Sequence, residues 1–86
     1  MRKADTITPI SDRTVNGIRV AVTHSEKFRE YTLTIDGETI ATAHAVNIVW
    51  SIKVGGKFNG IAQSDEAARR ALDTVADQFL AALAGA

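Results

Sequence analysis

The sequence predicts an α+β domain, an antiparallel meander of four or five strands with one C-terminal α-helix packed on one face. Apolar and polar residues alternate with period two through most of the stretch from Ile18 to Ala62. Dipeptides typical of two-residue hairpin turns interrupt this alternation: Asn16-Gly17, Asp36-Gly37 and Gly55-Gly56. From Ser64 onwards the apolar spacing changes to the three- and four-residue steps of an amphipathic helix.

The N-terminal residues 1–14 are polar, contain the only proline, and show no sustained period. We expect them to form a flexible arm or an edge strand beside a single domain that covers residues 15–86. Asn16-Gly17 then predicts a hairpin, because both of its turn positions need a positive φ. The strand after this turn has its apolar side chains on one face: Ile18, Val20 and Val22.

The middle of the chain predicts three further strands. A polar loop over 24–29 leads to a strand in which Tyr31, Leu33 and Ile35 alternate with threonines. The turn at Asp36-Gly37 would place Leu33 opposite Ile40 and Thr34 opposite Thr39, and the next strand runs on to Ala45. After a weak break near Asn47, a strand is expected with these residues turned to the core: Ile48, Trp50, Ile52 and Val54.

Gly55-Gly56 turns the chain into a last strand over 57–62, and the helix follows. Ser64 is a favoured N-cap, and Asp65 and Glu66 stand where the helix dipole stabilises negative charge. Both carboxylates have an arginine four residues later, and Gly85 ends the helix. The side chains expected to bury the helix against the sheet are Leu72, Val75, Phe79, Leu80 and Leu83.

Composition limits the possible functions. Eighty-six residues are enough for one core, and the absence of cysteine excludes disulfides, thiolate zinc sites and a thiol nucleophile. Ten basic residues balance ten acidic ones, so the whole-molecule field does not attract nucleic acid or anionic lipid. No apolar run approaches membrane-spanning length and no secretory signal is recognisable. These features predict a cytoplasmic protein without a membrane partner.

The stretch "GKFNGIAQSDEAARRAL" joins a glycine turn, a short strand and an abrupt helix start. Together with the strand before it, this part of the chain, about residues 48–84, resembles two families of sheet-plus-C-terminal-helix modules. These are the double-stranded-RNA-binding domain and the ethylene-response-factor DNA-binding domain; some integrase arm-binding domains are similar. The resemblance implies that the chain could bind nucleic acid.

The binding residues of those families are not matched here. Asp65 and Glu66 stand where the RNA-binding family has a lysine cluster, and carboxylates repel phosphates. Trp50 has the parity of the apolar core residues, whereas the ethylene-response-factor type projects its tryptophans from the open sheet. Only Arg19 and Lys53 are cations expected on that sheet face, which are few for reading a groove.

Candidate catalytic and metal-ligating residues are scattered. His24 and His44 fall at strand ends and could approach each other near Glu26 or Glu30, but no metal-ligand spacing is present. The carboxylates belong to turns, the helix cap and the wet side of the helix, where nothing desolvates them. We therefore expect no enzyme activity, no cofactor and no metal site.

The sheet face turned away from the helix has an unusual predicted composition. It is rich in threonine, alanine and serine, where a free solvent face normally carries many charged residues. A threonine-rich wet sheet is one interpretation, and a surface that a partner covers is the other. On the second interpretation, the residues that contact the partner are Arg19, Thr23, Thr32, Thr34, Thr39, Ala41, Ser51, Lys53 and Phe58.

These features predict a small non-enzymatic protein-binding module. The partner could be a second copy or a different protein, and the class that fits best is an adaptor or an inhibitor of a host enzyme, as phages and mobile elements encode. Two alternatives remain at this stage: a nucleic-acid-binding module that uses the sheet, and a structural homodimer with no other ligand.

Overall fold

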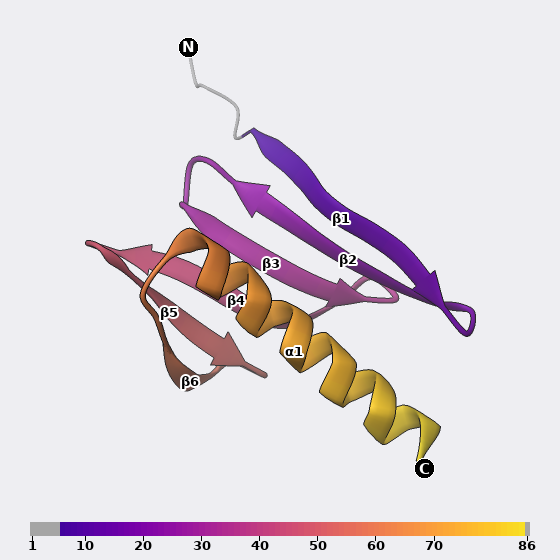
Figure 1. The fold of residues 1–86 in the computed structure, drawn as a ribbon. Helices are drawn as coiled ribbons and strands as arrows, with labels where there is room; N and C mark the ends of the chain where they lie inside the picture. The colour runs from indigo at the N-terminus through magenta and orange to yellow at the C-terminus, as the bar shows by residue number, and fades with distance from the viewer. Residues whose placement is uncertain (1–5, 86) are drawn as a thin grey trace.

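The computed structural model describes residues 6–85, which form a six-stranded antiparallel sheet with one helix packed diagonally across one face (Figure 1). The strands follow one another in the sheet in sequence order, as expected for a meander joined by hairpins. The elements are β1 (Ile7–Val15), β2 (Ile18–Ser25), β3 (Glu30–Ile35), β4 (Glu38–Val46), β5 (Val49–Val54), β6 (Lys57–Ala62) and α1 (Asp65–Ala84).

The sheet has six strands, so the expectation of four or five was too low. The additional strand is β1, which comes from the segment expected above to be a flexible arm or an edge strand; the edge strand is the alternative observed. It pairs with β2 from Ile7 to Val15 although it contains Pro9. Proline is tolerated on edge strands and at bulges, and here a β-bulge directly after Pro9 leaves Ile10 without a partner. Of the predicted arm, residues 1–5 lie outside the part of the chain that the structure describes.

The hairpin turns form where the dipeptides predict them. Asn16 and Gly17 have φ values of 52° and 80°, and Asp36 and Gly37 have φ values of 50° and 82°. Gly55-Gly56 also has both φ values positive. Positive φ at both central positions matches the right-handed twist of the flanking strands, which is why these dipeptides form tight hairpins.

The register between β3 and β4 differs from the one predicted. Thr34 pairs with Thr39 as expected, but Leu33 pairs with Ala41, so Ile40 is the extra residue of a β-bulge. Every residue of β4 after the bulge therefore points to the opposite face from the one that simple alternation assigns. Ala41 and Ala43 lie in the core, with 2% and 0% of their surface exposed.

The turn between β4 and β5 was also placed one residue too early. Asn47 and Ile48 form the turn, with Asn47 at a φ of 55°, and β5 begins only at Val49. Ile48 is therefore 88% exposed at the tip, and its expected core position is wrong. Trp50 lies on the helix side as predicted, where it is partly buried and its ring centroid is 5.1 Å from that of Tyr31.

The helix begins at the predicted cap. Ser64 has extended backbone angles, and its side chain accepts a hydrogen bond from the Ala67 amide at 3.1 Å. The two expected ion pairs also form in the first turns, Arg69 to Asp65 at 3.9 Å and Arg70 to Glu66 at 2.7 Å. The cap satisfies an amide that would otherwise have no partner, so it fixes where the helix starts.

Small side chains bring the helix close to the sheet. Its fully buried residues are Ala68, Leu72 and Ala76, and it packs over β3, β4, β5 and β6. Leu83, expected in the core, is 47% exposed because the last turns of the helix continue beyond the sheet (Figure 1). The buried side chains that face the helix from the sheet are Val20, Val22, Tyr31, Leu33, Ile35, Ala41, Ala43, Ile52 and Ala62.

A buried phenol joins the sheet to the start of the helix. The Tyr31 hydroxyl donates a hydrogen bond to the Asp65 carboxylate, one residue after the cap. Desolvation and this hydrogen bond raise the pKa of Tyr31 to about 12. The contact links the helix N-terminus to β3. No element of residues 6–85 covers the opposite face of the sheet.

Candidate protein-docking surface

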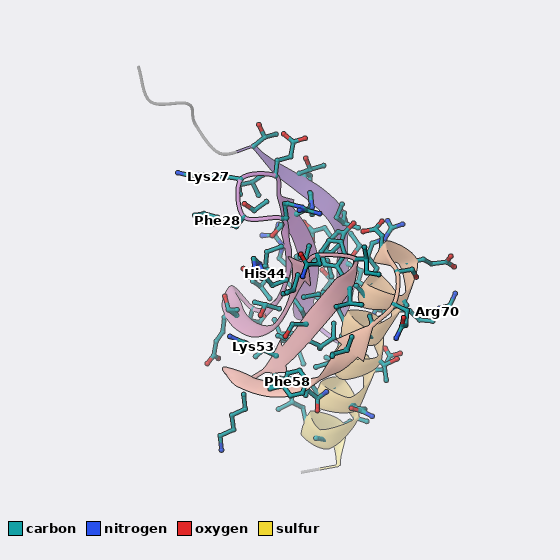
Figure 2. All side chains as sticks on the ribbon, turned by 90° about the vertical axis from the view of Figure 1, so that its left-hand side faces the viewer. Lys27, Phe28, His44, Lys53, Phe58 and Arg70 are labelled. Atoms are coloured by element: carbon teal, nitrogen blue, oxygen red, sulfur yellow. The ribbon has the colours of Figure 1, made fainter. Side chains whose placement is uncertain are left out.

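The uncovered face of the sheet is the candidate site, and we call it the open face. Figure 2 shows His44, Lys53 and Phe58 on this side of the molecule, whereas Arg70 lies on the helix at the other side. The register places the following residues on the open face: Ile7, Pro9, Asp12, Thr14, Arg19, Ala21, Thr23, Ser25, Glu30, Thr32, Thr34, Thr39, Thr42, His44, Val46, Val49, Ser51, Lys53, Phe58 and Ile61.

The structure brings together all but one of the residues predicted to contact a partner. The exception is Ala41, which the bulge at Ile40 turns into the core. The residues that do lie on the open face are Arg19, Thr23, Thr32, Thr34, Thr39, Ser51, Lys53 and Phe58. This outcome concerns their placement, and their role in binding stays a prediction.

A row of short side chains crosses the open face perpendicular to the strands. Thr23 of β2 pairs with Thr32 of β3, which pairs with Thr42 of β4. The row continues through Lys53 of β5 to Phe58 of β6. Threonine side chains are short and lose little rotamer entropy when they are covered, so this row forms a flat strip that another surface can approach closely.

The open face carries more charge than the sequence predicts, although much of it is paired. Arg19 makes two contacts to the Asp12 carboxylate, at 3.1 and 2.6 Å. This hydrogen-bonded pair lowers the pKa of Asp12 and raises that of Arg19. Since the guanidinium is already engaged, Arg19 is poorly placed to serve as a phosphate ligand.

The centre of the open face contains a shallow hollow of about 410 Å³. Glu30 lies on one side of it, with a carboxylate oxygen 3.8 Å from Nδ1 of His44. Lys53 lies on the other side. Six residues line the hollow: Glu30, Thr42, His44, Val46, Ser51 and Lys53. Both signs of charge therefore border one depression of the open face.

Apolar side chains are exposed along one margin of the open face. Phe58 and Ile61, both on the edge strand β6, are 65% and 58% exposed, and Val46 beyond the hollow is 45% exposed. Phe28, in the loop between β2 and β3, is 58% exposed and points to the same side (Figure 2). Large exposed apolar side chains that gather on one side of a protein mark a candidate surface for association with another protein.

The sequence did not predict several residues that the structure places on the open face: Glu30, Thr42, His44, Val46 and Ile61. In β4 the misassignment has a physical cause, because alternation counted from the turn cannot detect the bulge at Ile40. One signal was present in the sequence. Ala41, Ala43 and Ala45 alternate with the larger polar residues Thr42 and His44, and the alanines are the ones suited to close packing under a helix.

The two histidines do not form a joint site. His24 lies on the helix side of the sheet, where its ring centroid is 4.7 Å from that of Tyr31, whereas His44 lies on the open face. No group of three or more metal-ligating side chains occurs within residues 6–85. No helix in the same part of the chain is both long and apolar enough to cross a membrane.

A second hollow, of about 250 Å³, lies between β1 and the helix on the other side of the sheet. Its two arginines are already used within the chain, because Arg69 and Arg70 pair with the carboxylates of the first helical turn. Beside it, Arg13 of β1 bridges to Asp77 of the helix at 3.3 Å. These contacts hold the edge strand and the helix together.

Searches for related proteins give no further assignment: no protein-family model, curated protein or solved structure matches this chain.

Proposed function

We propose that this protein is a non-enzymatic binding module that docks onto another protein through the open face. The observation that carries the proposal is the strip of threonines, flanked by exposed Phe58 and Ile61, on a face that no element of the described chain covers. Covering such a strip costs little desolvation or side-chain entropy, and the apolar margin supplies a driving force.

The size of the surface supports the same proposal. Six strands about 4.8 Å apart and about six residues long give a plane of roughly 600 Å². A stable interface buries roughly 600–1,000 Å² on each partner. The open face therefore has the area of one partner's share, provided that most of it is used.

The charges on the open face favour a protein over a polynucleotide. Asp12 and Glu30 are carboxylates on this surface, and Arg19 is held by Asp12. A phosphate backbone needs several unengaged cations and is repelled by carboxylates. The role we propose within this class is that of an adaptor or an inhibitor of a host enzyme, of the kind that phages and mobile elements encode.

The test identifies what contacts the open face. A photoreactive phenylalanine derivative replaces Thr32, and a matched variant carries it at Gln78 on the exposed side of the helix. On illumination in the cells that encode the protein, we expect a protein adduct through position 32 and none through position 78. A polynucleotide adduct at position 32, or no protein adduct there, would overturn the proposal.

A pair of double variants tests whether the surface is required. Thr34→Lys with Thr42→Glu adds one charge of each sign to the open face, and Gln78→Lys with Ala82→Glu adds the same charges to the exposed side of the helix. We expect the first pair to abolish the adduct through position 32 and the second to leave it unchanged. Equal adduct yields in both would contradict the assignment of the surface.

A further inference from the structure

Glu30 and Lys53 border the same hollow but do not pair with each other. The Glu30 carboxylate lies 3.8 Å from Nδ1 of His44, which is longer than a hydrogen bond. Within residues 6–85, Lys53 has no ion-pair partner. The two residues lie two strands and two positions apart, which corresponds to about 12 Å between their Cα atoms.

We propose that the protein covering the open face is a second copy of this chain. This inference rests on the proposed function in one respect, that the open face is a protein-docking surface, and it names a second copy, in place of a host enzyme, as the partner of that surface. In a two-fold dimer each contact occurs twice with the roles exchanged. The required axis lies between the two sheets, passes over the midpoint of Glu30 and Lys53 on β4, and runs at right angles to the line that joins them. It brings Glu30 of each copy against Lys53 of the other.

The same axis also matches the apolar margin of the open face to itself. If the sheet is drawn as a flat grid, neighbouring strands lie about 4.8 Å apart and successive residues about 3.3 Å apart. On this grid the two-fold rotation places Ile61 of one copy over Val46 of the other. It carries Phe58 toward the loop between β2 and β3, which bears the exposed Phe28. The same two-fold rotation therefore pairs Glu30 with Lys53 and covers four exposed apolar side chains, those of Phe28, Val46, Phe58 and Ile61.

Two general properties of the molecule permit this arrangement. The chain has ten basic and ten acidic residues, so two copies do not repel each other through net charge. Sheets packed face to face lie about 10 Å apart with interdigitating side chains, so the side chains next to the axis need to fit into that space. Thr32 and Thr42 satisfy that need next to the axis.

The test is a charge swap measured by sedimentation velocity over a range of concentrations. Glu30→Lys leaves two cations at the paired positions, and Lys53→Glu leaves two anions. We expect the unchanged protein to sediment as a dimer and each single variant to dissociate at least about tenfold more readily. Asp73→Lys, on the exposed side of the helix, is the control and should leave the dimer intact.

Combining the two changes distinguishes the proposed pair from a general loss of stability. An equimolar mixture of Glu30→Lys and Lys53→Glu should form a mixed dimer, because contact between the unlike chains restores both ion pairs. The double variant carrying both changes should form its own dimer again. Failure of both combinations to dimerise, or single variants that dimerise as well as the unchanged protein, would overturn the inference.

The two proposals fail separately. An unchanged protein that stays monomeric at about 100 μM, a concentration well above the dissociation constants of ordinary stable complexes, would overturn the second copy as partner. The photoreactive variant at Thr32 would then still report whether a different protein lies on the open face. Crosslinking of two copies through position 32 supports protein docking through the open face with a second copy as the partner, and it gives no support to docking of a host enzyme on this face.

Discussion

At the scale of single residues, Ala41 and Thr42 are neighbours in β4 that lie in different environments. Ala41 is buried in the core beneath the helix, whereas Thr42 lies in the threonine row of the open face. Their placement depends on the β-bulge at Ile40, since a strand without it would exchange the two faces. The pair therefore reports directly on the register of the sheet.

We predict opposite outcomes for a glutamate at these two positions. Ala41→Glu buries an unpaired carboxylate and should lower the free energy of unfolding by roughly 3–5 kcal/mol. Thr42→Glu faces solvent beside Lys53 and should change it by less than about 1 kcal/mol. Urea denaturation at low protein concentration measures both, and a larger loss at Thr42 than at Ala41 would contradict the bulge.

Tyr31 gives a second prediction at this scale, because it is the only tyrosine in the chain. Its pKa is raised to about 12 by burial and by the hydrogen bond to Asp65, compared with 10 for a tyrosine in water. Tyrosinate absorbance at 295 nm should therefore titrate near pH 12 in the folded protein and near pH 10 in urea. A folded-state midpoint near 10 would show that the phenol is exposed.

The sign of the pH dependence follows from this shift. The folded state holds the phenolic proton more tightly than the unfolded state, so the stabilisation is complete below pH 10 and is lost as the pH rises from 10 to 12. Tyr31→Phe should cost about 1 kcal/mol near neutral pH, through loss of the hydrogen bond to Asp65. The variant should also lack the part of the stability loss at alkaline pH that comes from ionisation of Tyr31. The free energy of unfolding, measured as a function of pH for both proteins, tests this.

At the scale of elements, local chemistry was sufficient for the hairpins and the helix. Asn16-Gly17, Asp36-Gly37 and Gly55-Gly56 predict their turns because positive φ is a property of those residues themselves. Irregularities in pairing were not predictable in the same way. The bulges at Ile10 and Ile40 involve ordinary apolar residues, and their positions follow from how neighbouring strands and the helix pack together.

The helix start can be tested through its cap. Ser64→Ala removes the acceptor for the Ala67 amide and should lower the free energy of unfolding by about 1 kcal/mol. Ser64→Asp keeps an acceptor at the same place and should retain most of the stability. Thermal or urea denaturation compares the two variants with the unchanged protein, and equal losses would mean that the cap contributes nothing specific.

At the scale of the whole molecule, the sequence predicted which sides of the sheet are covered and uncovered, but not the charge pattern of the open face. The placement of Arg19, Lys53 and the threonines of β2 and β3 followed from period-two alternation. Glu30 was considered only as a possible neighbour of the two histidines, and His44 was assigned no place on the open face. Both become part of it because the register aligns them across β3 and β4.

The edge strand β1 also belongs to this scale, because its sequence does not reveal whether it is part of the folded unit. Most of its side chains are exposed, so it buries little apolar surface of its own. It nevertheless pairs along all of β2, which carries the core residues Val20 and Val22, and Arg13 links it to Asp77 of the helix. These contacts indicate that β1 shields one side of the core.

We therefore predict that deleting residues 1–15 destabilises the fold. The deletion exposes the backbone groups of β2 and uncovers part of Val20 and Val22, at a cost on the order of a few kcal/mol. An unprotected β2 edge should also promote aggregation. Deleting residues 1–5 alone is the control, because it leaves every described strand in place. Urea midpoints and light scattering compare both truncations with the full chain. If the chain that lacks residues 1–15 is as stable and as soluble as the full chain, this segment is a dispensable arm and the prediction is wrong.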